Sequence, residues 1–140
     1  MYRCYVLVSV LVFVLFAGCG GGSGTPSLPE VHLSGTSALA SASYDNGNGL
    51  KSNFLSFTAS RDGQAQATMT STEVFPKLIV RHGGKTGEVI DSNSPGGTYS
   101  PSVLLFSAKK GEQYTVEFTD WGSDVQLGSY TYTIDELTDR

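Results

Sequence analysis

Residues 54–70, FLSFTASRDGQAQATMT, alternate apolar and small polar side chains on both sides of Ser60-Arg61-Asp62-Gly63. An alternation of period two is typical of a β-strand with one buried face, and an Asp-Gly pair favours a tight turn. The segment therefore predicts two strands joined as a β-hairpin. The residues expected on its buried side are Leu55, Phe57, Ala59, Ala65, Ala67 and Met69.

The same alternation of apolar and polar residues occurs in the C-terminal third of the chain. It appears at 114–119 and again at 130–134, on either side of a predicted loop at 120–128. Shorter strands are expected at 30–33, 77–81 and 88–91, with turns or loops within 34–53. The consecutive apolar residues Val103 to Phe106 predict a strand at 102–108 that is buried on both faces. The side chains expected in the core are Phe57, Leu78, Val116, Phe118, Tyr132 and Ile134.

No window has a sustained apolar pattern at helical spacing, and 17 glycines punctuate the chain. Short strands separated by regular turn signals are typical of sandwiches and jelly rolls. We therefore expect an all-β fold, an antiparallel, jelly-roll-like β-sandwich, over residues 30–140.

The N-terminal segment has a different character. Arg3 precedes a run from Tyr5 to Ala17 that is apolar except for Ser9, and this run is too short to cross a bilayer as a helix. It ends in Leu15-Phe16-Ala17-Gly18-Cys19. Residues 20–29 are rich in Gly, Ser and Pro and predict a flexible tether.

Small residues before Cys19 at the end of such a run resemble a bacterial lipoprotein signal. The resemblance implies that residues 1–18 are a signal peptide, that residues 19–29 form a tether, and that the thiol of Cys19 carries a lipid. Gly20 is not the Asp that retains lipoproteins at the inner membrane, so the expected location is the cell envelope, at the outer membrane. An ordinary secretory signal and an uncleaved anchor remain the alternatives.

The composition narrows the class of function. The formal net charge is −4 and no basic patch is present, which argues against a nucleic-acid partner. The two cysteines are Cys4, inside the signal segment, and Cys19. A disulfide, a thiolate metal site and a cysteine nucleophile are therefore not expected in residues 30–140.

The order of features from Phe54 to Ile134 is similar to the bacterial pre-peptidase C-terminal domain family. The shared features are an aromatic strand with a glycine turn, an aliphatic strand, an Asp/Asn turn and two glycine-tyrosine strands, at 55–63, 77–80, 91–93, 111–116 and 128–134. The resemblance implies a jelly-roll-like sandwich that accompanies a secreted hydrolase in secretion, substrate binding or calcium-stabilised packing. That family's central strand often begins with Asp, where this chain has Phe75-Pro76-Lys77, so a role resting on that Asp is not carried over.

No catalytic pattern stands out. The two histidines, His32 and His82, belong to no hydrolase, metalloprotease or phosphate-binding motif, and His82 is expected in a surface turn. We expect no enzymatic activity.

Calcium is the one cofactor that the residues could hold, although none is required. Two predicted loops offer oxygen ligands on flexible chain, as Ca²⁺ prefers. Tight turns use the same residue types for their own geometry. The candidate ligands are Asp45, Asn46, Asn48, Asp91 and Asn93.

Trp121 is the only tryptophan and lies in the predicted loop 120–128. An exposed Trp could stack on a sugar ring or enter a protein interface, or it could close the end of the sandwich. Tyr44 and Tyr99 are candidates to share its surface. The sequence therefore predicts a lipid-anchored binding or structural module for an envelope protein or glycan. The alternative is a calcium-dependent accessory of a separately encoded hydrolase.

Overall fold

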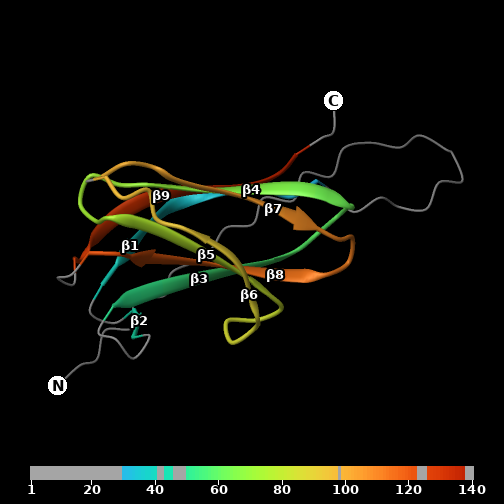
Figure 1. Ribbon diagram of the computed structural model, residues 1–140, viewed down its shortest axis with the longest axis horizontal. Coiled ribbons are helices and arrows are strands. Elements are labelled where there is room, and N and C mark those ends of the chain that lie inside the picture. Colours follow the sequence, from blue (N-terminus) through green and yellow to red (C-terminus); the bar gives the residue numbers. More distant parts are fainter. Residues whose placement is uncertain (1–29, 41–42, 46–49, 98, 123–125, 138–140) are drawn as a thin grey trace, which may run out of the picture.

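Two antiparallel sheets pack face to face as a β-sandwich in the computed structural model (Figure 1). The structure describes residues 30–40, 43–45, 50–97, 99–122 and 126–137. This confirms the all-β, antiparallel sandwich that the alternating pattern predicts. The strands are β1 (His32–Leu39), β2 (Tyr44–Asp45), β3 (Lys51–Thr58), β4 (Gly63–Thr70), β5 (Pro76–His82), β6 (Val89–Asn93), β7 (Ser102–Ala108), β8 (Gln113–Asp120) and β9 (Gly128–Leu137).

One sheet has four strands in the order β1-β9-β4-β7, and the other has five in the order β2-β3-β8-β5-β6. The chain passes repeatedly from one sheet to the other, so neighbours in sequence are often not neighbours in a sheet. Because β9 and β8 lie inside their sheets, the two C-terminal alternating segments become central strands.

The predicted hairpin of β3 and β4 is wrong. β3 pairs with β2 and β8 in the five-stranded sheet, whereas β4 pairs with β7 and β9 in the four-stranded sheet. Ala59 and Ser60 are buried in the connection between the sheets, where an ordinary hairpin turn would be exposed. The alternation correctly indicates which face of each strand is buried, but the two buried faces oppose each other across the core.

Glu136, a buried residue near the end of β9, holds this crossover in place. Its carboxylate accepts hydrogen bonds from the backbone N–H of Ser60 at 2.7 Å and of Val31 at 3.0 Å, and from the Ser60 hydroxyl. Arg61 donates to the Glu136 carbonyl oxygen at 2.7 Å. Burial opposes the charge of Glu136, but these hydrogen bonds and the Arg61 guanidinium outweigh burial and hold its pKa below the ordinary value.

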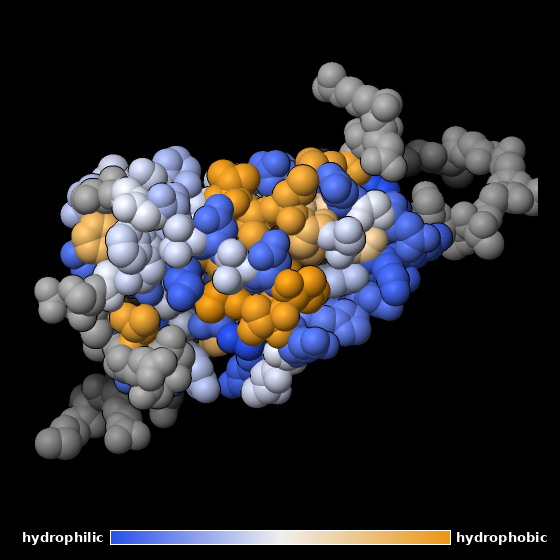
Figure 2. Space-filling model, in the orientation of Figure 1, coloured by the Kyte–Doolittle hydropathy of each residue, from blue (hydrophilic) through white to orange (hydrophobic). Residues whose placement is uncertain are grey.

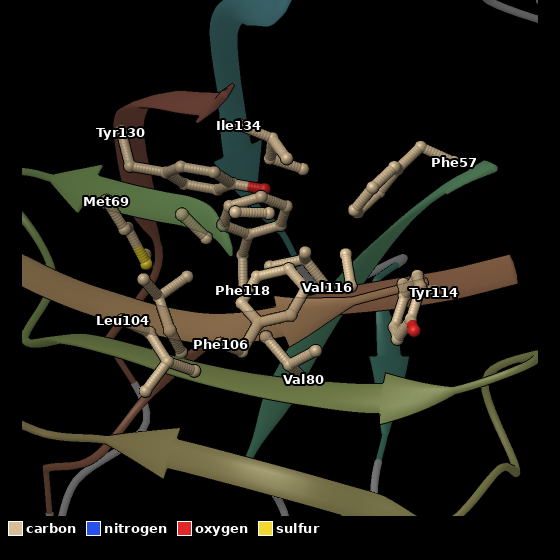
Figure 3. Close-up of a cluster of buried hydrophobic side chains, with 14 of the residues drawn as sticks. Phe57, Met69, Val80, Leu104, Phe106, Tyr114, Val116, Phe118, Tyr130 and Ile134 are labelled. Atoms are coloured by element: carbon tan, nitrogen blue, oxygen red, sulfur yellow. The ribbon is translucent and has the colours of Figure 1, made fainter. Parts of the chain in front are cut away.

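The core lies between the sheets and is rich in aromatic rings (Figure 3). Phe118 of β8 stacks on Tyr130 of β9 with ring centroids 5.4 Å apart, and Phe57 stacks on Tyr114 at 5.7 Å. The six expected core residues all contribute, although Tyr132 is only partly buried at the margin. These contacts confirm the register that the alternation predicts.

Strand β7 differs from its prediction, because only one of its faces is buried. Leu104 and Phe106 point into the core, whereas Val103 and Leu105 are 43% and 47% exposed. The reason is that Val103 and Leu105 lie on the outer face of the four-stranded sheet, which no element of the described residues covers.

The predicted strand at 30–33 is also longer and shifted. It is the edge strand β1, which continues to Leu39 through a segment poor in large apolar residues. Pairing with β9 along its whole length explains how small polar residues form a strand here. The predicted loop 34–53 is accordingly shortened.

Candidate ligand-binding site

β5 begins and β8 ends at the same end of the sandwich, on the left in Figure 1. Three aromatic side chains gather at this end. The ring of Phe75 contacts both of the others: it stacks on Tyr99, with centroids 5.4 Å apart, and packs at a tilt of 45° against Trp121, with centroids 5.6 Å apart. Trp121 is 36% exposed and Tyr99 is 40% exposed. We call Phe75, Tyr99 and Trp121 the aromatic cluster.

Asp120 fixes the position of Trp121. Its side chain is buried at the end of β8 and accepts backbone N–H bonds from Phe75 at 3.0 Å, from Gly122 at 3.2 Å and from Gln126 at 3.2 Å. The Trp121 N–H also donates to the carbonyl of Phe75 at 3.2 Å. One carboxylate therefore joins the segments that carry Phe75 and Trp121 and preorganises this pair of rings, whereas Tyr99 comes from a third segment, between β6 and β7.

Close packing excludes a larger residue beside the cluster. A Cβ atom on Gly122 would lie only 2.6 Å from the ring of Phe75. Glycine at this position thus lets the loop after β8 approach the ring closely.

Tyr99 has a φ of 57°, in the left-handed region that non-glycine residues seldom adopt. A backbone strained in this way persists only where its surroundings hold it, and such residues concentrate at functional sites. Here the strained backbone directs the tyrosine ring onto Phe75.

A hydroxyl-lined hollow of about 230 Å³ lies on the four-stranded sheet. The hydroxyls of Thr36, Thr70, Thr72 and Thr131 in its lining make no hydrogen bond within the described part of the chain. The segment 71–75 leads directly from this hollow to Phe75, so the two features occupy the same end of the molecule. The lining comprises Thr36, Thr70, Ser71, Thr72, Ser129, Tyr130 and Thr131.

Tyr44 does not touch the aromatic cluster. Its ring packs edge-on against Phe54 at 5.4 Å on the outer face of the five-stranded sheet, and the ammonium group of Lys85 lies 5.2 Å from its centroid. The structure thus brings Tyr99 and Trp121 together through Phe75 and places Tyr44 in a separate cluster.

The candidate calcium ligands divide between the two edges of the five-stranded sheet. Asp45 lies on β2 and Asp91 on β6, with three strands between them, so they cannot share one ion. Asn93 uses its amide to donate to the Val103 carbonyl at 2.5 Å. Asn46 and Asn48 lie outside the described residues. Within the described ranges, no three His, Cys, Asp or Glu side chains gather as metal ligands.

The histidines occupy the surface and pair with carboxylates. His82 contacts Glu112 at 3.0 Å, and His32 contacts Asp135. Neither ring bonds a serine hydroxyl within the described part of the chain.

Sequence reasoning identified Trp121 and Tyr99 from their residue type but missed Phe75 and Asp120. In the sequence, Phe75 is an apolar residue ahead of β5, and Asp120 is one of several acidic residues in or next to predicted loops. Neither residue type marks a site there. Only the pairing of β5 with β8, which sets Pro76 beside Asp120, brings them together. Cys19, the lipidation site that the sequence predicts, lies outside the described residues.

No protein-family model and no curated protein matches this chain. Among the described residues, no helix has the length and apolar character needed to span a membrane.

Proposed function

We propose that this protein is a non-enzymatic, glycan-binding module that Cys19 tethers to the bacterial cell envelope. The observation that carries the proposal is the preorganised aromatic cluster, in which buried Asp120 holds partly exposed Trp121 against Phe75. Aromatic rings that are fixed before binding lose little conformational entropy when a ligand stacks on them. A site built in this way suits a flat ligand with apolar C–H faces.

A glycan is favoured over a protein partner at this site by the hydroxyl-lined hollow nearby. A sugar presents apolar C–H faces and many hydroxyls, so it can use both the rings and the unpaired threonine hydroxyls. Asp120 is not assigned to the ligand, because its side chain is buried and both of its oxygens already accept hydrogen bonds from backbone N–H groups. The three rings and the threonine hydroxyls that the proposal assigns to the ligand carry no charge, which suits a neutral sugar.

Trp121→Ala should abolish most of the affinity for glycan. Truncating a central Trp anchor typically costs about 2 kcal/mol or more, which is roughly thirtyfold in the dissociation constant. The measurement is retention of the purified chain on insoluble neutral polysaccharides and on peptidoglycan.

Tyr44→Ala is the matched control, because it removes an exposed aromatic ring outside the cluster and should retain wild-type binding. Equal losses in the two variants, or no retention of the wild type on any of these matrices, would contradict the proposed site.

Cys19→Ala should prevent lipidation and leave the protein without an anchor. Acyl chains partition into a bilayer at about 0.8 kcal/mol per buried methylene, so two or more chains give stable attachment. In cells supplied with labelled fatty acid, the wild type should take up label and enter the detergent phase, and the variant should do neither. Equal labelling of both, or a wholly soluble wild type, would refute the tether.

A further inference from the structure

Strand β7 is the edge of the four-stranded sheet and pairs only with β4. Its outward residues Val103 and Leu105 are nearly half exposed. On the neighbouring edge of the other sheet, Val89 and Ile90 of β6 are exposed to a similar extent. Figure 2 shows an apolar patch over the β6 and β7 region.

The backbone of β7 also has free hydrogen-bonding capacity. The carbonyl of Val103 faces away from β4, because it accepts a bond from Asn93 of β6. In an antiparallel strand, alternate residues direct both backbone groups to the same side. Leu105 and Ser107 therefore face the same open edge, where their N–H and C=O groups have no partner within the described residues.

Natural edge strands are usually protected from pairing by charged side chains, proline, bulges or short length. β2 has only two residues, and the pairing of β6 with β5 is interrupted by a register shift. β1 presents mostly small polar side chains. By contrast, β7 has the sequence SVLLFSA, with no charge, no proline and no shift in its register.

The C-terminal end of β7 is followed by positively charged side chains. Lys109 and Lys110 follow β7 directly and are exposed, and neither ammonium group pairs with an acid in the described part of the chain. A strand that added antiparallel to β7 would begin beside these two lysines. Its first residues would therefore be stabilised if they were acidic.

We propose that β7 accepts an extended segment of a partner polypeptide as a fifth strand, antiparallel and with acidic residues at its N-terminal end. Main-chain hydrogen bonds to Leu105 and Ser107 would supply affinity, and an apolar side chain beside Leu105 would cover the patch. A second copy of this chain fits less well. Two-fold pairing centred on Leu105 would set Lys109 opposite Pro101, which offers no carboxylate.

The probe is a fluorescein-labelled peptide, Asp-Asp-Thr-Val-Thr-Val-Thr, titrated with the full chain in mild detergent and followed by anisotropy. Leu105→Lys should weaken its binding by about tenfold or more, because a charge would have to enter the strand pair. Val89→Lys is the matched control, with the same charge placed on equally exposed apolar surface of β6, and should bind within about twofold of wild type.

A charge exchange tests the orientation without relying on Leu105. The double variant Lys109→Glu, Lys110→Glu should prefer the peptide that begins Lys-Lys, whereas the wild type should prefer Asp-Asp. Equal binding of both peptides to both chains, or no binding of either, would overturn the proposal. Sedimentation of the wild type as a dimer that Leu105→Lys dissociates would overturn it in favour of self-association.

Discussion

Phe118→Ala is expected to lower the free energy of unfolding by about 3–5 kcal/mol, the usual cost of truncating a buried phenylalanine. Phe118 is 1% exposed in the middle of central strand β8. Its ring contacts Tyr130 and Tyr132 of the opposite sheet, with centroids 5.4 and 5.1 Å away. Alanine would therefore open a cavity between the two sheets, where both sheets resist collapse.

Urea unfolding of the wild type and of Phe118→Ala measures this loss of stability directly. Phe54→Ala is the control, because Phe54 lies half-buried on the outer face of the adjacent strand and its truncation leaves no internal cavity. The loss for Phe54 should be clearly smaller. A loss below about 1 kcal/mol for Phe118→Ala would place this ring at the surface and contradict the register of β8.

Arg81→Ala should cost about 3 kcal/mol, because it leaves a buried carboxylate without its counter-charge. Glu117 is 2% exposed on the outer face of β8 and accepts bonds from Arg81 at 2.8 and 3.2 Å and from Ser52 at 2.7 Å. Partial exposure of the Arg81 side chain sets the expected value at the lower end of the range for buried pairs.

A second substitution, Glu117→Gln, shows whether the stability lost in Arg81→Ala comes from the unpaired charge or from lost packing. If the cost arises from an unpaired charge, adding Glu117→Gln to Arg81→Ala should restore much of the lost stability in thermal or urea unfolding. A double variant that is as unstable as Arg81→Ala, or less stable, would assign the loss to packing of the arginine stem instead.

The alternation in the sequence determined which side chains face the core, but not which strands are neighbours. An alternation of apolar and polar residues shows only that a strand has one buried face. In β3 and β4 the two segments bury their apolar residues toward each other from opposite sheets, so the local pattern is identical to that of a hairpin. The buried Ser60 and its contacts with Glu136 distinguish the two arrangements, and both depend on tertiary structure.

The sequence failed to predict the exposed face of β7 and the full aromatic cluster for the same reason: both depend on tertiary structure. Four consecutive apolar residues at 103–106 fit a strand buried on both faces, but they also fit an exposed edge available for pairing. At the cluster, Trp121 and Tyr99 were identifiable because exposed aromatic residues in loops are candidates for binding. Phe75 and Asp120 join them only through the pairing of β5 with β8, which no local motif encodes.

The emission of Trp121 tests the glycan-binding site most directly, because Trp121 is the only tryptophan in the chain. Titration with soluble neutral oligosaccharides should change its intensity or emission maximum along a saturable curve. The same titration of Phe75→Ala should show weaker binding, since the central ring of the cluster is lost. An unchanged spectrum across the oligosaccharide series, with the chain folded, would contradict the proposed function.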